Sequence, residues 1–387
     1  MEYIPYGRQC IDDDDIEAVV SVLRSDWLTQ GPAIEKFEQS VAQYCGVKYA
    51  VAVNSATSAL HIACLAAGLG QNDILWTSPN TFVASANCGL YCGASVNFVD
   101  IDPVTYNMSI QCLQERLKLA EKNNTLPKVI IPVHFAGQSC EMEEIQQLAD
   151  KYGFTVIEDA SHAIGGAYKN RPIGSCHFSD MTVFSFHPVK IITSGEGGMV
   201  LTNDEKLYEK LILFRSHGIT RNPQVMTEAA HGSWYYQQID LGYNYRITDI
   251  QAALGLSQIK KMDTFVKRRH EIALRYNEEL SQLPLRLPWQ NPMTYSAYHL
   301  YVVRLVLDKI KLTHKEAFEA LRDANIGVNL HYIPVHTQPY YRQLGFNWGD
   351  YPEAEQYYKE AISIPMYVGL SYDQQTYVIS KLKEILL

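Results

Sequence analysis

The sequence predicts an α/β fold with a large, mostly parallel sheet and a smaller α/β domain at the C-terminal end. A chain of 387 residues is long enough for two domains. Short runs that are apolar at nearly every position alternate with segments of helical spacing, which is typical of a parallel sheet covered by helices on both faces. Pro284, Pro288 and Pro292 interrupt the chain after a long helical pattern and indicate a change of domain.

The large domain is expected to begin with two helices, over residues 12–25 and 33–45. The run from Asp12 to Asp15 places negative charge at the start of the first helix, where the helix dipole favours it. Seven strands are expected at Tyr49–Val53, Ile74–Thr77, Val96–Val99, Val129–Val133, Thr155–Ile157, Thr182–Phe186 and Met199–Leu201. Helices are expected between them at 57–69, 81–93, 109–122 and 140–152.

The second half begins with apolar residues at helical spacing from Arg246 to about Leu280, which predict one long helix. We therefore assign residues 1–250 to the large domain, and residues 251–387 to a linking helix and a small C-terminal domain. In the small domain a strand is expected at His299–Leu307. Two capping boxes, Thr313-x-x-Glu316 and Ser371-x-x-Gln374, predict the starts of helices.

Composition narrows the possible functions. A formal charge of −9 argues against nucleic acid as a main partner. No apolar run approaches the ~20 residues that span a bilayer, and the start Met1-Glu2-Tyr3 does not resemble a signal segment. The eight cysteines show no CxxC spacing and no histidine pair beside them, so we expect reduced thiols in a cytoplasmic protein and no metal site.

Polar residues follow several strands at the edge where α/β proteins bind ligands. Ser55 to Ser58 stand at a strand-to-helix junction, which either binds an anion or simply caps the helix. Phe82 could stack on a flat ring or belong to the core. Asp159 ends an apolar strand, where a carboxylate is costly unless positive charge meets it. Lys190 lies on a turn that follows Phe184–Phe186.

Taken together, these strand ends meet the requirements of pyridoxal phosphate. A lysine with a lowered pKa can form an imine with the cofactor, although most lysines are surface charges. A carboxylate such as Asp159 keeps the pyridine nitrogen protonated. The junction at Ser55–Ser58 would hold the phosphate, with Ser185 Oγ as a further donor.

Much of the chain resembles the DegT/StrS-type pyridoxal-phosphate-dependent aminotransferases that act on nucleotide-linked sugars. The matching stretches are Leu28-Thr29-Gln30-Gly31-Pro32, Asn54-Ser55-Ala56-Thr57-Ser58-Ala59-Leu60, Asn80-Thr81-Phe82-Val83-Ala84, Val99-Asp100-Ile101-Asp102, Pro132-Val133-His134, Glu158-Asp159-Ala160-Ser161-His162-Ala163, Ser185-Phe186-His187-Pro188-Val189-Lys190, Gly195-Glu196-Gly197-Gly198 and Gly242-Tyr243-Asn244-Tyr245-Arg246. The resemblance implies the aspartate-aminotransferase-like fold (fold type I) and a homodimer with two active sites at its interface.

The resemblance also implies roles for single residues. Lys190 would be the Schiff-base lysine, Asp159 the partner of the pyridinium nitrogen, and Phe82 the stacking ring. The remaining cofactor contacts would be the backbone of Ala56 and Thr57 with Ser185 at the phosphate, His162 near the ring hydroxyl, and Asn244 reaching the phosphate from the neighbouring subunit. Asn244 could instead be a turn residue before the long helix. Many members have glycine where this chain has Ala56. Because alanine allows fewer backbone conformations than glycine, the approach to the phosphate is slightly more constrained here.

Three stretches resemble the transaminase branch of pseudaminic acid synthesis: Arg215-Ser216-His217-Gly218, Trp234-Tyr235-Tyr236 and Val328-Asn329-Leu330-His331-Tyr332-Ile333-Pro334-Val335-His336. That branch aminates C4 of a UDP-linked 4-keto-6-deoxy-N-acetyl-hexosamine. We expect glutamate as the amino donor and ping-pong kinetics. The expected substrate contacts are Thr29, Arg215, His331 and Tyr332.

Several alternatives stay open at this point. The substrate could carry dTDP or GDP, and amination could occur at C3 or C4. The aromatic stretch at Trp234 could stack on sugar or uracil, or form a dimer contact. The basic clusters Lys260-Lys261 and Lys267-Arg268-Arg269 could meet the diphosphate or form a solvated helix face. A cofactor-binding regulator without catalysis is a further alternative, while Lys190 disfavours a sugar dehydratase.

Overall fold

The computed structural model describes residues 2–387 and contains the predicted seven-stranded sheet. In spatial order the strands are β1 (Tyr49–Val53), β9 (Gly198–Thr202), β8 (Met181–Ser185), β5 (Thr155–Asp159), β4 (Val129–Ile131), β2 (Ile74–Thr77) and β3 (Ser95–Phe98). Only β9 is antiparallel to its neighbours, β1 and β8. The predicted strand ends differ from the observed ones by up to two residues, and the fold class is confirmed.

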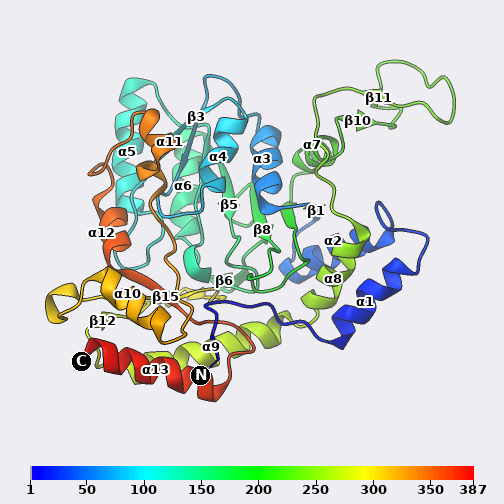
Figure 1. The fold of residues 1–387 in the computed structure, drawn as a ribbon. Helices are drawn as coiled ribbons and strands as arrows, with labels where there is room; N and C mark the ends of the chain where they lie inside the picture. Colours follow the sequence, from blue (N-terminus) through cyan, green and yellow to red (C-terminus); the bar gives the residue numbers. More distant parts are fainter. Residues whose placement is uncertain (1) are drawn as a thin grey trace.

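Helices cover both faces of this sheet because alternate strand residues point to opposite sides (Figure 1). On one side Leu75, Ile131 and Ile157 pack with α3 (Ala56–Ala66), α4 (Ala84–Tyr91) and α7 (Glu205–Arg215). On the other side Trp76, Ile130 and Val156 pack with α5 (Ile110–Asn123) and α6 (Met142–Tyr152). Near β1, α2 (Pro32–Cys45) packs on the sheet and on α8 (Asp249–Ile259).

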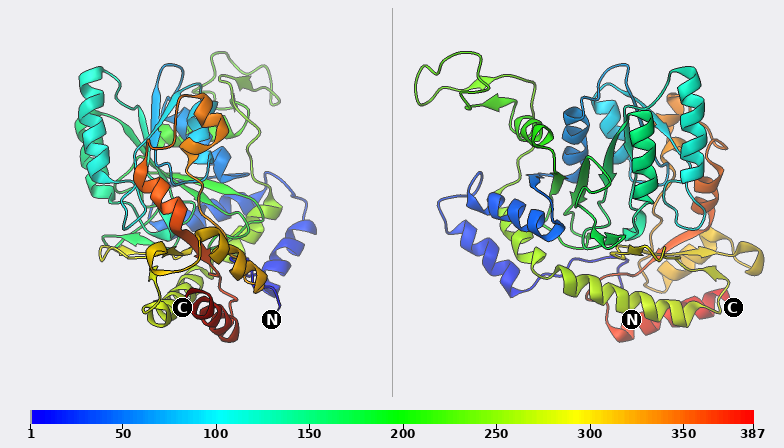
Figure 2. Two further views of the ribbon diagram at one scale, coloured as in Figure 1. Left: turned by 60° about the vertical axis from the view of Figure 1, so that its left-hand side comes forward. Right: turned by 180° about the vertical axis from the view of Figure 1, so that it is seen from behind.

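The prediction of one long helix from Arg246 to Leu280 is wrong. The chain forms α8 and then α9 (Met262–Leu280), with a break at Lys260–Lys261. Lys261 Nζ binds Asp15 Oδ1 at 2.9 Å and also contacts Asp12, which ties the break to α1 (Asp13–Leu23). The two helices pack on different parts: α8 lies on α1 and α2, whereas α9 lies beside α13 (Tyr372–Leu386) (Figure 2). The predicted boundary at residue 250 falls inside α8.

The C-terminal part forms a small antiparallel sheet with helices around it. The sheet has the order β12 (Leu285–Arg286), β14 (Tyr301–Leu305) and β15 (Ala361–Ile364). Both predicted capping boxes are present, at the starts of α10 (His314–Asp323) and α13. The remaining helices of this part are α11 (Pro339–Gln343) and α12 (Pro352–Glu360). A further sheet of β13 (Thr294–Tyr295), β6 (Ala167–Tyr168) and β7 (Arg171–Pro172) joins it to the large domain.

A hairpin projects from the body of the chain after α7 (Figure 1). Its strands are β10 (Ile219–Thr220) and β11 (Gln237–Gln238). Trp234 is 72% exposed and Leu241 is 70% exposed, so this arm presents apolar side chains to its surroundings. Over residues 2–387, no helix has the length and apolar character needed to cross a membrane.

Candidate active site

A cavity of about 790 Å³ lies where β1, β5 and β8 end. Its walls come from the segments after these strands and from a stretch of the C-terminal part. Of the residues predicted for the site, the cavity is lined by Ala56, Thr57, Phe82, Asp159, His162, Ser185, Lys190, His331 and Tyr332. The sheet therefore brings together residues more than 270 positions apart, as expected for ligand binding at the carboxyl ends of strands.

The first wall is the N-terminus of α3. Ser55 is its N-cap, and the Ser55 hydroxyl accepts a hydrogen bond from Ser58 N at 3.1 Å. The N–H groups of Ala56 and Thr57 open the helix, so neither has an acceptor within it. A Cβ on Gly198 would lie 2.5 Å from Ala56 N, so β9 can approach this helix end only with glycine there. The junction is capped by Ser55 and still offers N–H groups and a helix dipole to an anion.

Asp159 is a buried carboxylate that faces the same cavity as Lys190. Its Oδ2 accepts from Ser85 Oγ at 2.6 Å. Its Oδ1 accepts from Ser161 Oγ at 2.6 Å and from Ser161 N at 3.1 Å. These donors fix the orientation of the carboxylate at the wall of the cavity. We did not predict the contact from Ser85, because Ser85 belongs to α4 and lies 74 residues from Asp159.

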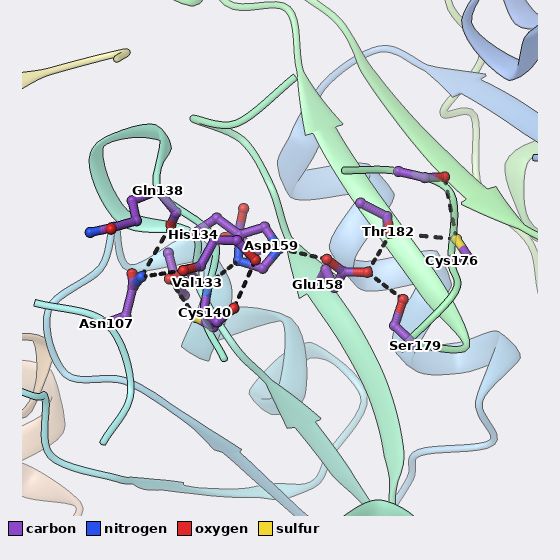
Figure 3. A network of polar contacts seen from close by, with 12 residues as sticks. Asn107, Val133, His134, Gln138, Cys140, Glu158, Asp159, Cys176, Ser179 and Thr182 are labelled. Atoms are coloured by element: carbon purple, nitrogen blue, oxygen red, sulfur yellow. Dashed lines mark hydrogen bonds and ion pairs between the residues drawn. The ribbon is translucent and has the colours of Figure 1, made fainter. Parts of the chain in front are cut away.

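Glu158, the neighbour of Asp159, faces the opposite side of β5 (Figure 3). It contacts His134 Nε2 at 2.5 Å and accepts from Thr182 Oγ1 at 3.0 Å, with Ser179 as a third partner. On the same stretch Asp159 N donates to Pro132 O at 2.9 Å. These contacts hold the end of β5 in place. Glu158 therefore stabilises the strand, whereas Asp159 faces the cavity.

Lys190 ends the turn that follows β8, where its N–H donates to His187 O at 2.9 Å. Its partly buried side chain lines the cavity. Desolvation lowers the pKa of Lys190 to about 8, while the negative charge of Asp159 opposes this change. The amine is therefore neutral at mildly basic pH, as a nucleophile or general base requires.

Phe82 and Tyr332 form the aromatic part of the cavity wall. Phe82 is 57% exposed, so it does not belong to the core, and its ring centroid lies 6.3 Å from that of Tyr332. An exposed ring beside a polar cavity is suited to stacking on a flat ligand.

His162 orients the hydroxyl of Tyr332. Ala136 N donates to His162 Nδ1 at 3.3 Å, so the ring proton sits on Nε2, which lies 3.0 Å from Tyr332 Oη. Burial holds the pKa of His162 well below its ordinary value, and Lys190 and His331 act in the same direction. The neutral imidazole donates to Tyr332, which leaves the tyrosine O–H to donate into the cavity.

Three predicted site residues do not line this cavity within the described chain: Thr29, Arg215 and Asn244. Arg215 Nη1 lies 2.5 Å from Glu38 Oε1 and donates to Ala52 O at 2.9 Å. Thr29 forms a bridge with Thr248, and Asn244 is exposed and forms a bridge with Ser216.

The two basic clusters are mainly structural. Lys261 pairs with α1, as described above. Arg269 is 1% exposed and donates to the carbonyl oxygens of Tyr298, His299 and Met366, so the solvated-face alternative is wrong for it. Among the described residues no arginine lines the cavity.

Sequence reasoning missed several cavity residues. They are Tyr6, Glu196, His299 and Asn329. Tyr6 reaches the cavity because the N-terminal segment runs along the C-terminal part, where Ile4 bridges Ile326. Nothing in the local sequence signals such a long-range contact.

Comparison with known proteins identifies the family. Residues 9–383 match the DegT/DnrJ/EryC1/StrS aminotransferase family. The spore coat polysaccharide biosynthesis protein SpsC of Bacillus subtilis is 41% identical, over 99% of this chain and 97% of that protein. The UDP-4-amino-4,6-dideoxy-N-acetyl-beta-L-altrosamine transaminase of Campylobacter jejuni is 38% identical over the same shares.

Solved structures agree with this assignment. Helicobacter pylori PseC, an aminotransferase involved in the biosynthesis of pseudoaminic acid, superposes with a TM-score of 0.90 and 32% identity. The match covers 100% of this chain and 99% of that one.

Members of this family use pyridoxal phosphate, and the cavity fits that cofactor. The start of α3 offers N–H groups to a phosphate, Asp159 offers a buried carboxylate to a protonated ring nitrogen, and Lys190 offers an amine with a lowered pKa. The chain belongs to the DegT/DnrJ/EryC1/StrS family and is a pyridoxal-phosphate-dependent sugar aminotransferase.

Proposed function

We propose that this enzyme aminates C4 of a UDP-linked 4-keto-6-deoxy-N-acetyl-hexosamine, with L-glutamate as the amino donor. The observation that carries most weight is the end-to-end similarity, at 38% identity, to a transaminase named for that amino sugar. PseC superposes with a TM-score of 0.90 and another sugar aminotransferase, Spr1654 of Streptococcus pneumoniae, with 0.89, so the fold supports the enzyme class and the sequence similarity supports the sugar. Surface-glycan synthesis of the pseudaminic acid type is the corresponding role.

Lys190 is the catalytic residue of this proposal. When bound, pyridoxal phosphate supplies an electron sink that stabilises negative charge on the carbon that carries the amine. Lys190 Nζ, neutral at mildly basic pH, would take the proton from the α-carbon of the donor as a base and, once protonated, would give a proton to C4′ of the cofactor as an acid. In the second half-reaction the same proton transfers run in reverse on the keto sugar and yield the amino sugar. Because the donor product leaves before the sugar binds, the kinetics are ping-pong.

The other residues bind and orient. Asp159 supplies a fixed negative charge toward the ring nitrogen. Ala56, Thr57 and Ser185 would donate to the phosphate, and Phe82 would stack on the ring. His162 fixes the hydroxyl of Tyr332, which donates toward the bound molecules.

We also propose a homodimer in which each subunit completes the other's site. Asn244 stands at the base of the projecting hairpin and is exposed, so it is free to meet a second copy. Thr29 and Arg215 likewise lie outside their own chain's cavity. Because no arginine of residues 2–387 lines the cavity, a second subunit would supply the positive charge that a diphosphate needs.

A second candidate is amination of a different nucleotide-linked keto sugar. The 41% identity to SpsC, whose name places it in spore coat polysaccharide synthesis, favours keeping this candidate. It would carry dTDP or GDP, with the new amine at C3 or C4.

A panel of UDP-, dTDP- and GDP-linked 3-keto and 4-keto sugars with glutamate tests the proposal. We expect turnover of the UDP-linked 4-keto-6-deoxy-N-acetyl sugar, with the new amine at C4 in the NMR spectrum of the product. Faster turnover of a dTDP- or GDP-linked sugar, or a C3 amine, would establish the second candidate instead.

A further inference from the structure

The segment that carries Asn244 joins the projecting hairpin to α8. It pairs in antiparallel bridges with the end of β1 and with the residues after α7, so it runs as an extended strand. In such a strand neighbouring side chains point to opposite sides. Tyr243 and Tyr245 share one side, where their ring centroids lie 4.9 Å apart with 16° between the ring planes. Asn244 belongs to the other side and is exposed.

The two tyrosines pack on a buried histidine of α3. His61 is 5% exposed, and its ring centroid lies 4.8 Å from that of Tyr243 and 5.9 Å from that of Tyr245. Its Nδ1 lies 3.1 Å from Tyr245 Oη, while Nε2 has no hydrogen-bond partner among residues 2–387. Tyr91, at the end of α4, contacts the same ring at 5.5 Å. Within the described chain, Tyr245 is therefore the one hydrogen-bond partner of the His61 ring.

The same helix also forms part of the cavity wall. The start of α3 lines the cavity, and His61 follows Thr57 by four residues, so both lie on one face of the helix. Just before the helix, Asn54 N donates to Tyr245 O at 2.8 Å. Beside it, α3 packs on α7, which leads into the projecting hairpin (Figure 1). One helix thus contacts both its own chain's cavity and the segment that carries Asn244.

Given the shared dimer site proposed above, on which this inference rests, we propose that His61 is a positioning residue that fixes Asn244 for the site of the neighbouring subunit. The ring holds Tyr243 and Tyr245 by apolar contact and by one hydrogen bond. With that side of the segment fixed, the backbone presents the Asn244 amide on the opposite side. The helix that offers N–H groups to the phosphate of one site thereby also holds the phosphate contact of the other.

Loss of the His61 contact therefore affects the neighbouring subunit's site and spares the site of the altered chain. Hybrid dimers separate these two sites. In a hybrid of a Lys190→Ala chain and a His61→Phe chain, only the second chain can bind pyridoxal phosphate through Lys190. That site receives Asn244 from a chain with intact His61, so it should be normal. In the reverse hybrid, one chain carries both changes and the other is unaltered, so the site that keeps Lys190 should be impaired.

Titration of pyridoxal phosphate into purified dimers tests this directly, with the visible absorbance of cofactor bound through Lys190 as the readout. Two affinity tags isolate the hybrids. The His61→Phe homodimer should bind the cofactor about tenfold more weakly than the unaltered enzyme, and Tyr245→Phe about threefold more weakly, as expected for one neutral hydrogen bond. The control His177→Phe alters an exposed histidine and should leave the affinity unchanged. Circular dichroism and light scattering confirm folded dimers.

Weak binding in the first hybrid together with normal binding in the reverse hybrid would overturn the proposal, because His61 would then act in its own chain's site. Unchanged affinity of the His61→Phe homodimer would overturn it as well. Tyr245→Phe, placed in the same two hybrids, gives a smaller shift in the same pattern and serves if His61→Phe does not fold.

Asn244→Ala in place of His61→Phe separates failure of this inference from failure of the shared site. If the Asn244→Ala hybrids show the expected pattern and the His61→Phe hybrids do not, the role of His61 alone is rejected. If Asn244→Ala weakens binding only in its own chain's site, or has no effect, the shared site is rejected and the role of His61 with it.

Discussion

The cofactor side and the substrate side of this enzyme are built in different ways. On the cofactor side, Asp159, Ser185 and Lys190 follow adjacent strands of one sheet, and all line one cavity in a single chain. Of the predicted substrate contacts, His331 and Tyr332 line the same cavity, whereas Thr29 and Arg215 lie outside it, as does Asn244, the predicted phosphate contact from the neighbouring subunit. Sheet topology therefore brings the cofactor residues together within one chain, whereas Thr29, Arg215 and Asn244 would reach a site only in the proposed dimer.

The largest effect is expected at Lys190. Lys190→Ala removes the only lysine that lines the described cavity, so turnover should fall by about 10⁴-fold or more, and the visible absorbance of the bound cofactor should change. Kinetics with glutamate and the keto sugar measure this. The control is Lys118→Ala, an exposed lysine on α5, which should behave as the unaltered enzyme.

Adjacent carboxylates on β5 give the next test. Asp159→Asn should lower kcat by about 10²-fold, because it removes the charge that faces the ring, while the amide oxygen can still accept from Ser161 and the amide nitrogen can donate to Ser85 Oγ. Glu158→Gln should leave kcat nearly unchanged and lower the free energy of unfolding by about 1–3 kcal/mol, because it weakens the buried contacts with His134, Ser179 and Thr182. Equal effects of the two changes on kcat would contradict the division of tasks between them.

Mixing inactive subunits tests whether Asn244 completes the site of the neighbouring subunit. If Asn244 acts in the neighbouring subunit, Lys190→Ala and Asn244→Ala chains that have exchanged subunits should recover roughly a quarter of full activity, since half the dimers contain one intact site. Each variant alone is the control and should stay inactive or strongly impaired. No recovery after proven exchange would place Asn244 in its own chain's site.

The smallest effect is expected at Tyr332. Tyr332→Phe keeps the ring but removes the hydroxyl that accepts from His162, so kcat/KM should fall by about tenfold, the equivalent of one neutral hydrogen bond. Tyr340→Phe, on an exposed residue of α11, is the matched control. A loss as large as that of Lys190→Ala would make Tyr332 a catalytic residue.

Features encoded by local sequence patterns could be predicted, whereas features that depend on contacts between distant segments could not. The seven strands were predictable because each is a continuous apolar run, and Asp159 and Lys190 were conspicuous as charged residues at the ends of such runs. The break between α8 and α9 could not be predicted, because the helical spacing of apolar residues continues across it. The ion pair between Lys261 and Asp15 at this break joins residues 246 positions apart. The burial of Arg269 was hidden for a similar reason, since its three carbonyl partners lie on segments distant in sequence. The pairing of Arg215 with Glu38 likewise depends on tertiary packing.

Reductive trapping of the cofactor tests the central claim most directly. The unaltered enzyme, loaded with pyridoxal phosphate, is treated with borohydride, digested and mapped by mass spectrometry. The account predicts a phosphopyridoxyl group on Lys190 Nζ and its loss when excess glutamate is added before the borohydride. A label on any other lysine, or a label on Lys190 that glutamate leaves unchanged, would contradict it.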